Sequence, residues 1–220
     1  MNVTITGQPP FDPVTLQDVY KSLRLDTEGS PETHADDSLL ASLITAATRH
    51  VDHMGRLSTI RRHLRVSYPR FPAKPTEFVR YGPADRMKSV NALAMIYPPV
   101  LNISSIRYYD ADNTLQTIPH ADYFLPDQQQ PQVVFKTGYI APTLYDRPDA
   151  VQINYYAGYQ PSVNNPTTQA EYAANVPTSI KRAIILQVQA LYDDLAPADY
   201  ERVQRAIESL IQPYRVQIAI

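Results

Sequence analysis

Apolar residues recur at helical intervals of three and four positions near both ends of the chain. Two such stretches, 15–23 and 36–54, precede the middle of the chain, and two others, 179–195 and 197–211, follow it. An amphipathic helix cannot bury its apolar stripe alone, so we expect these four helices to pack on one another. The pattern therefore predicts a small helical bundle made of two N-terminal and two C-terminal helices.

Particular residues indicate where these helices begin and end. Thr15 is followed three residues later by Asp18, a spacing typical of a capping box that satisfies the first free N–H groups. Gly55 follows the last apolar residue of the second helix, and glycine readily adopts the left-handed conformation that ends a helix. We therefore expect Gly55 to be the left-handed residue.

Between the helical stretches the apolar period becomes two, which indicates β-strands. Residues 64–68 alternate, residues 151–155 alternate before Gly158, and the segment 98–118 reads as strand, polar turn and returning strand. The apolar positions of 98–118 change parity after Ile103, which predicts a β-bulge near Ser104–Ser105. The predicted fold class is α+β, with a central antiparallel β-sheet inserted into the bundle.

These patterns predict a domain division in which residues 1–57 and 176–220 form the bundle and residues 58–175 form the β-rich insertion. Both ends of the chain, 2–6 and 214–220, alternate like strands. Strand-like ends either add to a neighbouring subunit's sheet or groove, or pack against their own subunit, and the pattern leaves both open.

Composition limits the class of protein. The chain has no cysteine, which excludes disulfides and thiolate metal sites. Its start lacks the basic and apolar regions of a signal peptide, and its apolar runs are far shorter than the roughly 20 residues that span a bilayer. We expect a soluble protein with no membrane partner.

The net charge of −2 is unevenly distributed. Residues 56–88 contain nine basic and two acidic residues, a net charge of +7, whereas the remainder carries −9. Such asymmetry indicates either a solvated face or a surface that attracts nucleic-acid phosphates without reading sequence. The candidate DNA-facing or intersubunit residues are Arg61, Arg62, Arg65 and Arg70.

The sequence carries little that suggests catalysis. His50 and His53 lie one helical turn apart with Asp52 nearby, but no spacing nominates a third metal ligand. Residues 110–121 begin like a calcium loop but lack its glycine and its final glutamate, so we interpret Asp110 as part of a turn. Phosphate-binding glycine loops, G-x-S-x-G elbows and cysteine nucleophiles are missing. We expect no enzyme, no metal and no cofactor.

The order of these pieces resembles that of the head–tail connector family of tailed phages, the adaptor or head-completion proteins. The matching stretches are VTLQDVYKSLRLD, DDSLLASLITAATRHVDHMG, PPVLNISSIRYYDADNTLQTI with the following DYFL, RPDAVQINYYAGY, VPTSIKRAIILQVQALYDD and LIQPYR. Together they cover most of the chain from Val14 to Arg215.

The resemblance implies a structural protein of the virion neck that assembles in the host cytoplasm. It implies a homo-oligomeric ring, a dodecamer, that lies beneath the portal protein, contacts tail or stopper proteins and surrounds the genomic DNA without reading its sequence. Family members hold the portal largely through their C-terminal region. The residues that the resemblance assigns to portal binding are Tyr214, Arg215, Val216, Ile218 and Ile220.

Two alternatives remain open at the level of sequence. One is another ring component of the virion, a tail-proximal stopper or tail-completion protein. The other belongs to a different class, a small metal-dependent hydrolase that would use His50 and His53.

Overall fold

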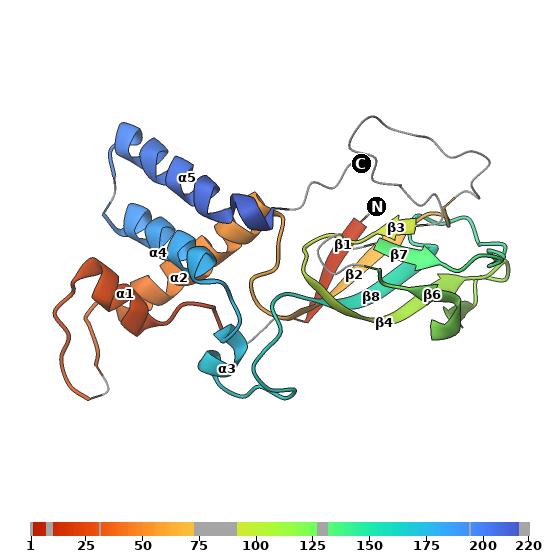
Figure 1. Cartoon of the computed structure of the whole chain (residues 1–220), viewed down its shortest axis with the longest axis horizontal. Helices are drawn as coiled ribbons and strands as arrows, with labels where there is room; N and C mark the ends of the chain where they lie inside the picture. The colour runs from red at the N-terminus through yellow and green to blue at the C-terminus, as the bar shows by residue number, and fades with distance from the viewer. Residues whose placement is uncertain are drawn as a thin grey trace. The chain divides into compact units, whose positions relative to one another are not determined.

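The computed structural model describes residues 2–7, 11–30, 32–72, 92–126, 132–193 and 195–215. Figure 1 shows the chain with its elements labelled. The helices are α1 (Leu16–Leu23), α2 (Asp37–Gly55), α3 (Gln169–Ala173), α4 (Thr178–Tyr192) and α5 (Pro197–Ile211), with 3₁₀ turns η1 (His120–Asp122) and η2 (Gln212–Tyr214). The strands are β1 (Asn2–Gly7), β2 (Arg62–Tyr68), β3 (Ala92–Ala94), β4 (Val100–Tyr109), β5 (Leu115–Ile118), β6 (Tyr123–Phe124), β7 (Gln132–Phe135) and β8 (Val151–Ala157).

The chain divides into two compact units, each with its own apolar core. The sheet unit contains the described residues of 1–8 and 62–157, and the helical unit those of 9–61 and 158–217. These limits differ from the predicted division at three places, one of which is that residues 58–61 belong to the helical unit. β1 belongs to the sheet unit because it pairs with β2. The segment that follows Gly158 belongs to the helical unit, where Gln169 donates hydrogen bonds to the carbonyl groups of Asp12 and Val14.

The helical unit confirms that the N-terminal and C-terminal helices share one core. Buried side chains from α1, α2, α4 and α5 form a continuous cluster, whose largest fully buried members include Leu40, Ile180, Ile184 and Ile207. The capping box at α1 is present in both directions, since Asp18 N–H donates to Thr15 and the Asp18 carboxylate accepts from Thr15 N–H. Together with the sheet unit, this arrangement confirms the α+β fold class.

The end of α2 differs from the prediction. Gly55 is the last helical residue, and Arg56 adopts the left-handed conformation, with φ 50°. A Cβ atom on Gly55 would lie 2.6 Å from Cδ2 of Leu57. Glycine at this position therefore leaves room for the Leu57 side chain, and the chain reverses one residue later.

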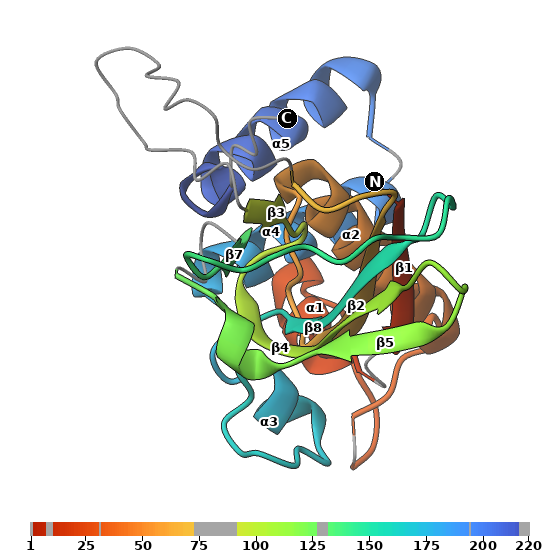
Figure 2. The ribbon, with the colours of Figure 1, turned by 90° about the vertical axis from the view of Figure 1, so that its right-hand side faces the viewer.

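Among the described residues, the sheet unit contains two antiparallel sheets, a five-stranded one with the order β1-β2-β8-β4-β5 and a three-stranded one with the order β3-β7-β6. Figure 2 shows the strands of the larger sheet side by side. Each sheet contributes its buried face to one core, in which Ile106 and Ile153 of the larger sheet cluster with Val133 and Phe135 of the smaller one.

The central strand–turn–strand segment forms as predicted. β4 and β5 pair in antiparallel register, with Ile106 opposite Ile118. The register of β4 against β8 shifts between Ile103 and Ser105, which confirms the predicted bulge. Asp110 Oδ1 accepts hydrogen bonds from the N–H groups of Asp112 and Thr114, so this segment is a turn, as interpreted from the sequence.

No helix among the described residues is long and apolar enough to cross a membrane.

Candidate interaction surfaces

The five-stranded sheet buries one face and presents a polar face on the other side. Along β2, Leu64 and Val66 point into the core, so Arg65 and its alternate neighbours lie on the opposite side. The registers place the corresponding residues of the other strands beside them, and we call this surface the outer face. Its members are Asn2 and Thr4 of β1, His63, Arg65 and Ser67 of β2, Gln152, Asn154 and Tyr156 of β8, Ser105, Arg107 and Tyr109 of β4, and Leu115 and Thr117 of β5.

The middle of the outer face is held by hydrogen bonds between side chains. Asn154 is buried; its Oδ1 accepts from Nε of Arg65 at 2.8 Å, and its Nδ2 donates to Oγ of Ser105 at 3.1 Å. This row connects β2, β8 and β4 across the sheet. Arg65 is thereby fixed in place by a neutral partner, and its charge is retained.

His63 continues the outer face toward β1. Its Nδ1 lies 2.6 Å from Oγ1 of Thr6, and its ring packs 4.8 Å from that of Tyr156. Burial, together with the nearby Arg65 charge, lowers the pKa of His63. Arg65 and the exposed Arg107 are therefore the residues that give the outer face positive charge at neutral pH.

At the hairpin end of the sheet unit, a basic side chain is already neutralised. Arg147 lies over the ring of Tyr109 and donates to both carboxylate oxygens of Asp149, at 2.6 and 3.0 Å. It also donates to Asn113 in the β4–β5 turn. This bidentate pairing fixes the hairpin, and Asp149 neutralises the charge of Arg147.

The structure does not gather the four arginines that the sequence grouped together. Arg65 lies on the outer face, whereas Arg62 lies on the opposite face of β2 by alternation. Arg61 precedes the strand and donates to the carbonyl oxygen of Asn164, and Arg70 is exposed beyond the end of β2. Further basic residues of the predicted segment, Lys74, Arg80, Arg86 and Lys88, lie outside the described residues.

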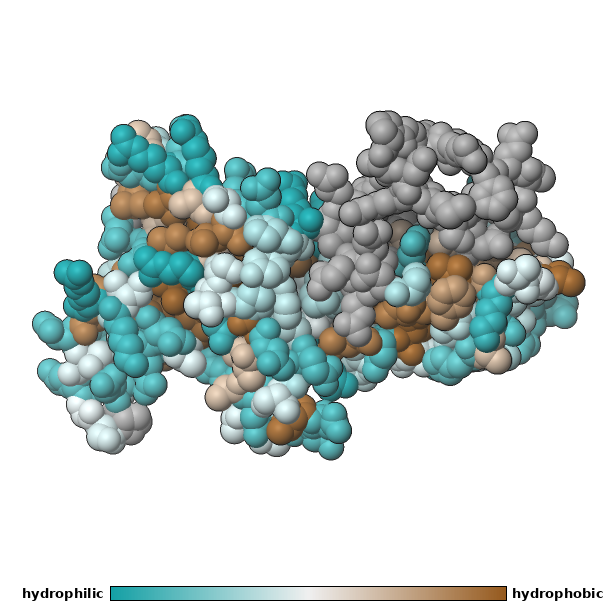
Figure 3. Space-filling view, viewed as in Figure 1, coloured by the Kyte–Doolittle hydropathy of each residue, from teal (hydrophilic) through white to brown (hydrophobic). Residues whose placement is uncertain are grey.

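An acidic loop connects α1 to α2 in the helical unit. Between Asp26 and Asp37 the chain has five carboxylates and no lysine or arginine. We define residues 26–37 as the acidic loop. Figure 1 shows it extending away from the helices, and mostly hydrophilic side chains cover this region in Figure 3.

The tip of the acidic loop is a small hairpin. Glu28 and Thr33 exchange two backbone hydrogen bonds of 3.0 and 2.9 Å, and Oγ1 of Thr33 also donates to the Glu28 carbonyl group. Gly29 takes a φ of 83°, which a residue without Cβ adopts freely. The carboxylates of Asp26, Glu28 and Glu32 are exposed, so the hairpin presents negative charge on a defined backbone.

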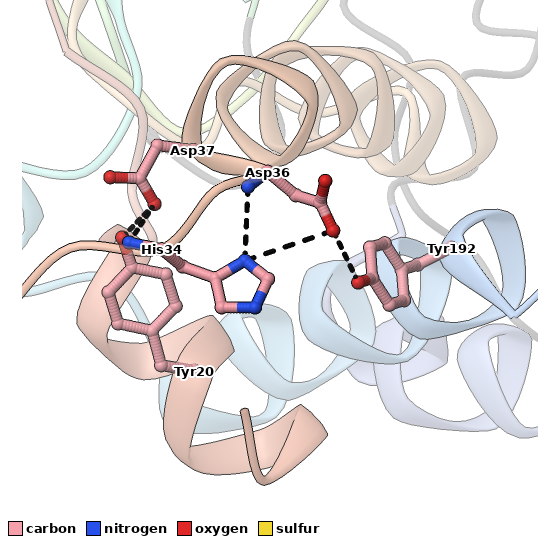
Figure 4. A network of polar contacts seen from close by, with 5 residues as sticks. All are labelled: Tyr20, His34, Asp36, Asp37 and Tyr192. Carbon is pink, nitrogen blue, oxygen red and sulfur yellow. Dashed lines mark hydrogen bonds and ion pairs between the residues drawn. The ribbon is translucent and has the colours of Figure 1, made fainter. Parts of the chain in front are cut away.

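The base of the acidic loop is fastened to the bundle by the polar network of Figure 4. The hydroxyl group of Tyr20 on α1 donates to Asp37, and that of Tyr192 on α4 donates to Asp36 at 2.8 Å. Nδ1 of His34 accepts from the Asp36 N–H group at 3.1 Å. Burial and the hydrogen bond to Asp37 raise the pKa of Tyr20 to about 12, so this hydroxyl stays protonated at neutral pH.

The two histidines of α2 lie in different surroundings. Nε2 of His50 lies 3.1 Å from Oε1 of Gln204, in a row of side-chain hydrogen bonds that continues to Gln187 and connects α2, α5 and α4. His53 is exposed. Within the described ranges, no group of three histidine, aspartate or glutamate side chains is arranged to hold a metal ion.

The C-terminal residues assigned to portal binding are described only in part. Tyr214 ends η2, packs against the helical core and accepts a hydrogen bond of 2.9 Å from Ser179. Arg215 is exposed, and Val216, Ile218 and Ile220 lie outside the described residues.

Two elements of these surfaces were missed by sequence reasoning, the acidic loop and Arg107. The sequence could have indicated the acidic loop, because five acidic residues and no lysine or arginine occur between Asp26 and Asp37. The sequence could also have placed Arg107 on the outer face, since it follows Ile106, which the strand pattern places in the core.

No protein-family model and no curated protein matches the sequence. Solved structures do match over 100% of this chain and 98% of theirs. They are "Virion of native gene transfer agent (GTA) particle" at 16% identity and TM-score 0.68, "Neck of empty GTA particle computed with C6 symmetry" at 17% and 0.68, and "Neck of native GTA particle computed with C12 symmetry" at 15% and 0.65. The chain therefore shares its fold with chains of the gene transfer agent particle and its neck.

Proposed function

We propose that this chain is a structural protein of a virion neck, a head–tail adaptor that forms a ring beneath the portal. The observation that carries the proposal is the fold match over the full length of both chains to structures described as a virion and its neck. At this level of identity the likeness concerns the fold, and the resemblance of the sequence to phage connector proteins also supports the role.

The proposed ring is a dodecamer that surrounds the DNA exit path. The matched neck structures were computed with C6 and with C12 symmetry, which supports a ring, and the number of twelve copies comes from the resemblance to connector proteins. Arg61, Arg62, Arg65 and Arg70 remain candidates for loose contact with DNA or with a neighbouring subunit, and their different positions mean that not all of them serve one surface.

The C-terminal residues are proposed to hold the portal. An alternating apolar stretch suits addition to a groove or sheet edge of a partner. Tyr214 contacts the helical core of its own chain, so we place the portal-binding segment at 216–220, with Arg215 at its start.

Deletion of residues 216–220 tests this proposal directly. The truncated chain should keep its thermal midpoint but lose capture of the portal protein encoded with it. The matched control is Tyr214→Phe, which removes the hydrogen bond from Ser179 and leaves the tail intact. Unchanged portal capture by the truncated chain would contradict the assignment of the tail.

A second candidate is a tail-proximal stopper ring, because the matched structures are described as a neck as a whole. Pull-down experiments against purified portal protein and purified tail-proximal proteins separate the two. The adaptor binds the portal, whereas the stopper binds the tail side only. Light scattering that shows a monomer, together with binding to neither partner, would overturn both assignments.

A further inference from the structure

The helical unit and the sheet unit carry surfaces of opposite charge. The acidic loop presents exposed Asp26, Glu28 and Glu32 on a fixed hairpin. On the outer face of the sheet, the exposed Arg107 and the half-buried Arg65 lie beside the buried polar side chains of Ser67, Gln152 and Asn154. No acidic residue is among the members of this face. Each chain therefore has both halves of a complementary pair.

The composition of the outer face favours a protein partner over nucleic acid. Duplex DNA carries about one negative charge per 1.7 Å of its axis, and its binding sites usually neutralise many phosphates. Two arginines separated by neutral side chains provide little for such a backbone. Arginine and tyrosine are, however, enriched at protein interfaces, and Tyr109, Tyr156 and Leu115 supply apolar area beside the charges.

Both surfaces are also preformed. Arg65 is fixed by Asn154, and the acidic loop is fixed at its tip by Thr33 and at its base by Tyr20 and Tyr192. Docking of ordered groups costs less conformational entropy than docking of mobile ones. This supports a specific contact rather than diffuse attraction.

We propose that the acidic loop of one copy docks on the outer face of the sheet unit of the next copy, head to tail. The inference rests on the proposed ring and names its subunit contact. A contact between two different patches of the same chain is heterologous, and its repetition closes into a ring when the rotation between copies permits. Glu28 and Glu32 approach Arg65 and Arg107 in this contact.

Single cysteines test the contact, because the natural chain has none. Glu28→Cys and Arg107→Cys change exposed side chains, and the Glu28 backbone hydrogen bonds do not need its carboxylate. The two full-length variants carry different tags, are mixed and are oxidised gently. A covalent heterodimer should exceed either homodimer by about tenfold, as expected of a contact with complementary charge.

The control pairs Arg107→Cys with Glu208→Cys, an exposed acidic position on α5 outside the loop. That mixture should give only background crosslinking. Mixing two separate chains also excludes a contact within one chain, which cannot produce the heterodimer. Equal crosslinking by both pairs would overturn the proposal.

Charge reversal provides a second measurement. Arg65→Glu/Arg107→Glu and Glu28→Lys/Glu32→Lys should each abolish the oligomer in light scattering, because like charges then meet. Their mixture restores attraction at every contact of an alternating ring, so the oligomer should return. Circular dichroism confirms that each variant is folded, and the cysteine pair decides the matter if one is not.

The two proposals fail in different ways. Rings that form without the specific heterodimer overturn this contact and leave the neck function standing. Heterodimers without rings or portal binding overturn the neck function alone. If no heterodimer forms and Arg107→Glu abolishes a mobility shift of duplex DNA, the outer face belongs to nucleic acid and the proposal is wrong.

Discussion

A single glycine, Gly158, allows two backbone segments of the helical unit to approach each other closely. Gly158 has a φ of 116°, and a Cβ atom placed on it would lie 2.4 Å from the backbone carbonyl group of Ile60. This close approach accompanies a parallel bridge between Ile60 and Tyr159. Glycine is therefore required at position 158 for two reasons: the positive φ, and the lack of space for a side chain beside Ile60.

Replacement of Gly158 by alanine should destabilise the protein by about 2–5 kcal/mol, the sum of backbone strain and overpacking. Chemical denaturation measures the change. Gly138→Ala is the matched control, because Gly138 also has a positive φ, 89°, but has nothing within 4 Å of the added methyl group. Equal losses in the two variants would mean that the contact with Ile60 adds nothing.

Substitutions at two neighbouring residues at the end of α2 should change the stability of the protein in opposite directions. Arg56→Gly should stabilise the protein by about 1 kcal/mol, because Arg56 holds a left-handed conformation that glycine adopts without steric cost. Gly55→Ala should destabilise it, because the new methyl group meets Leu57. Thermal melts of both variants check the signs, and a stabilising Gly55→Ala would contradict this account of the terminus.

At the scale of elements, hairpins, turns and bulges can be predicted from residues close together in the sequence, whereas the order in which distant strands pair cannot. The β4–β5 hairpin, its turn and the bulge at Ser105 were all indicated by parity and turn residues. The short α3 and the two-residue β6 were not, because elements of that length show no full period in the sequence.

The β4–β5 turn predicts a pH effect. The hydrogen bond from Gln116, followed by that from Thr114, lowers the pKa of Asp110. A carboxyl group whose pKa is lower in the folded state adds stability above its ordinary pKa, and that stability disappears as the pH falls through the folded value. Acidification below about pH 4 should therefore loosen this turn.

Amide exchange at Thr114, followed by NMR, measures this loosening. In Asp110→Asn the exchange at Thr114 should be faster at neutral pH and nearly independent of pH between 2 and 5, after correction for intrinsic rates. The control is Asp112→Asn, in which the side-chain acceptor for Thr114 remains. An Asp110→Asn variant with the natural pH dependence would show that another group is responsible.

At the scale of the molecule, two cores support two different surfaces. The helical unit holds the acidic loop through Tyr20 and Tyr192, and the sheet unit holds the outer face through Asn154. The cores share no buried residue among those described. Shortening a buried side chain in either core should therefore destabilise mainly the unit that contains it.

Ile184→Ala should destabilise the helical unit, and Ile153→Ala the sheet unit, each by about 2–5 kcal/mol, because both side chains are fully buried. Hydrogen exchange with mass spectrometry locates the effect. Peptides of α2 and α4 should exchange faster in the first variant, and peptides of β2 and β8 in the second. Uniform acceleration over the whole chain in both variants would argue for a single cooperative unit.

The sequence by itself determined the local structure: the helical stripes, the capping box at Thr15, the alternation of β2 and the turn at Asp110. These depend on side-chain periods and on hydrogen bonds between residues close in the chain. The same alternation places Arg65 and Arg62 on opposite faces of β2, but it does not show which face is exposed to solvent.

Only the tertiary structure decided that β1 pairs with β2 of its own chain, that Arg56 rather than Gly55 turns left-handed, and that Arg65 and Arg107 share one face. The pairing of β1 and the shared face of Arg65 and Arg107 depend on contacts between segments distant in sequence, as in the strand order β2-β8-β4. The left-handed turn at Arg56 follows instead from the close packing of the buried Leu57 side chain beside Gly55. A periodic pattern specifies the two sides of an element, and long-range hydrogen bonds and close packing specify what lies against each side.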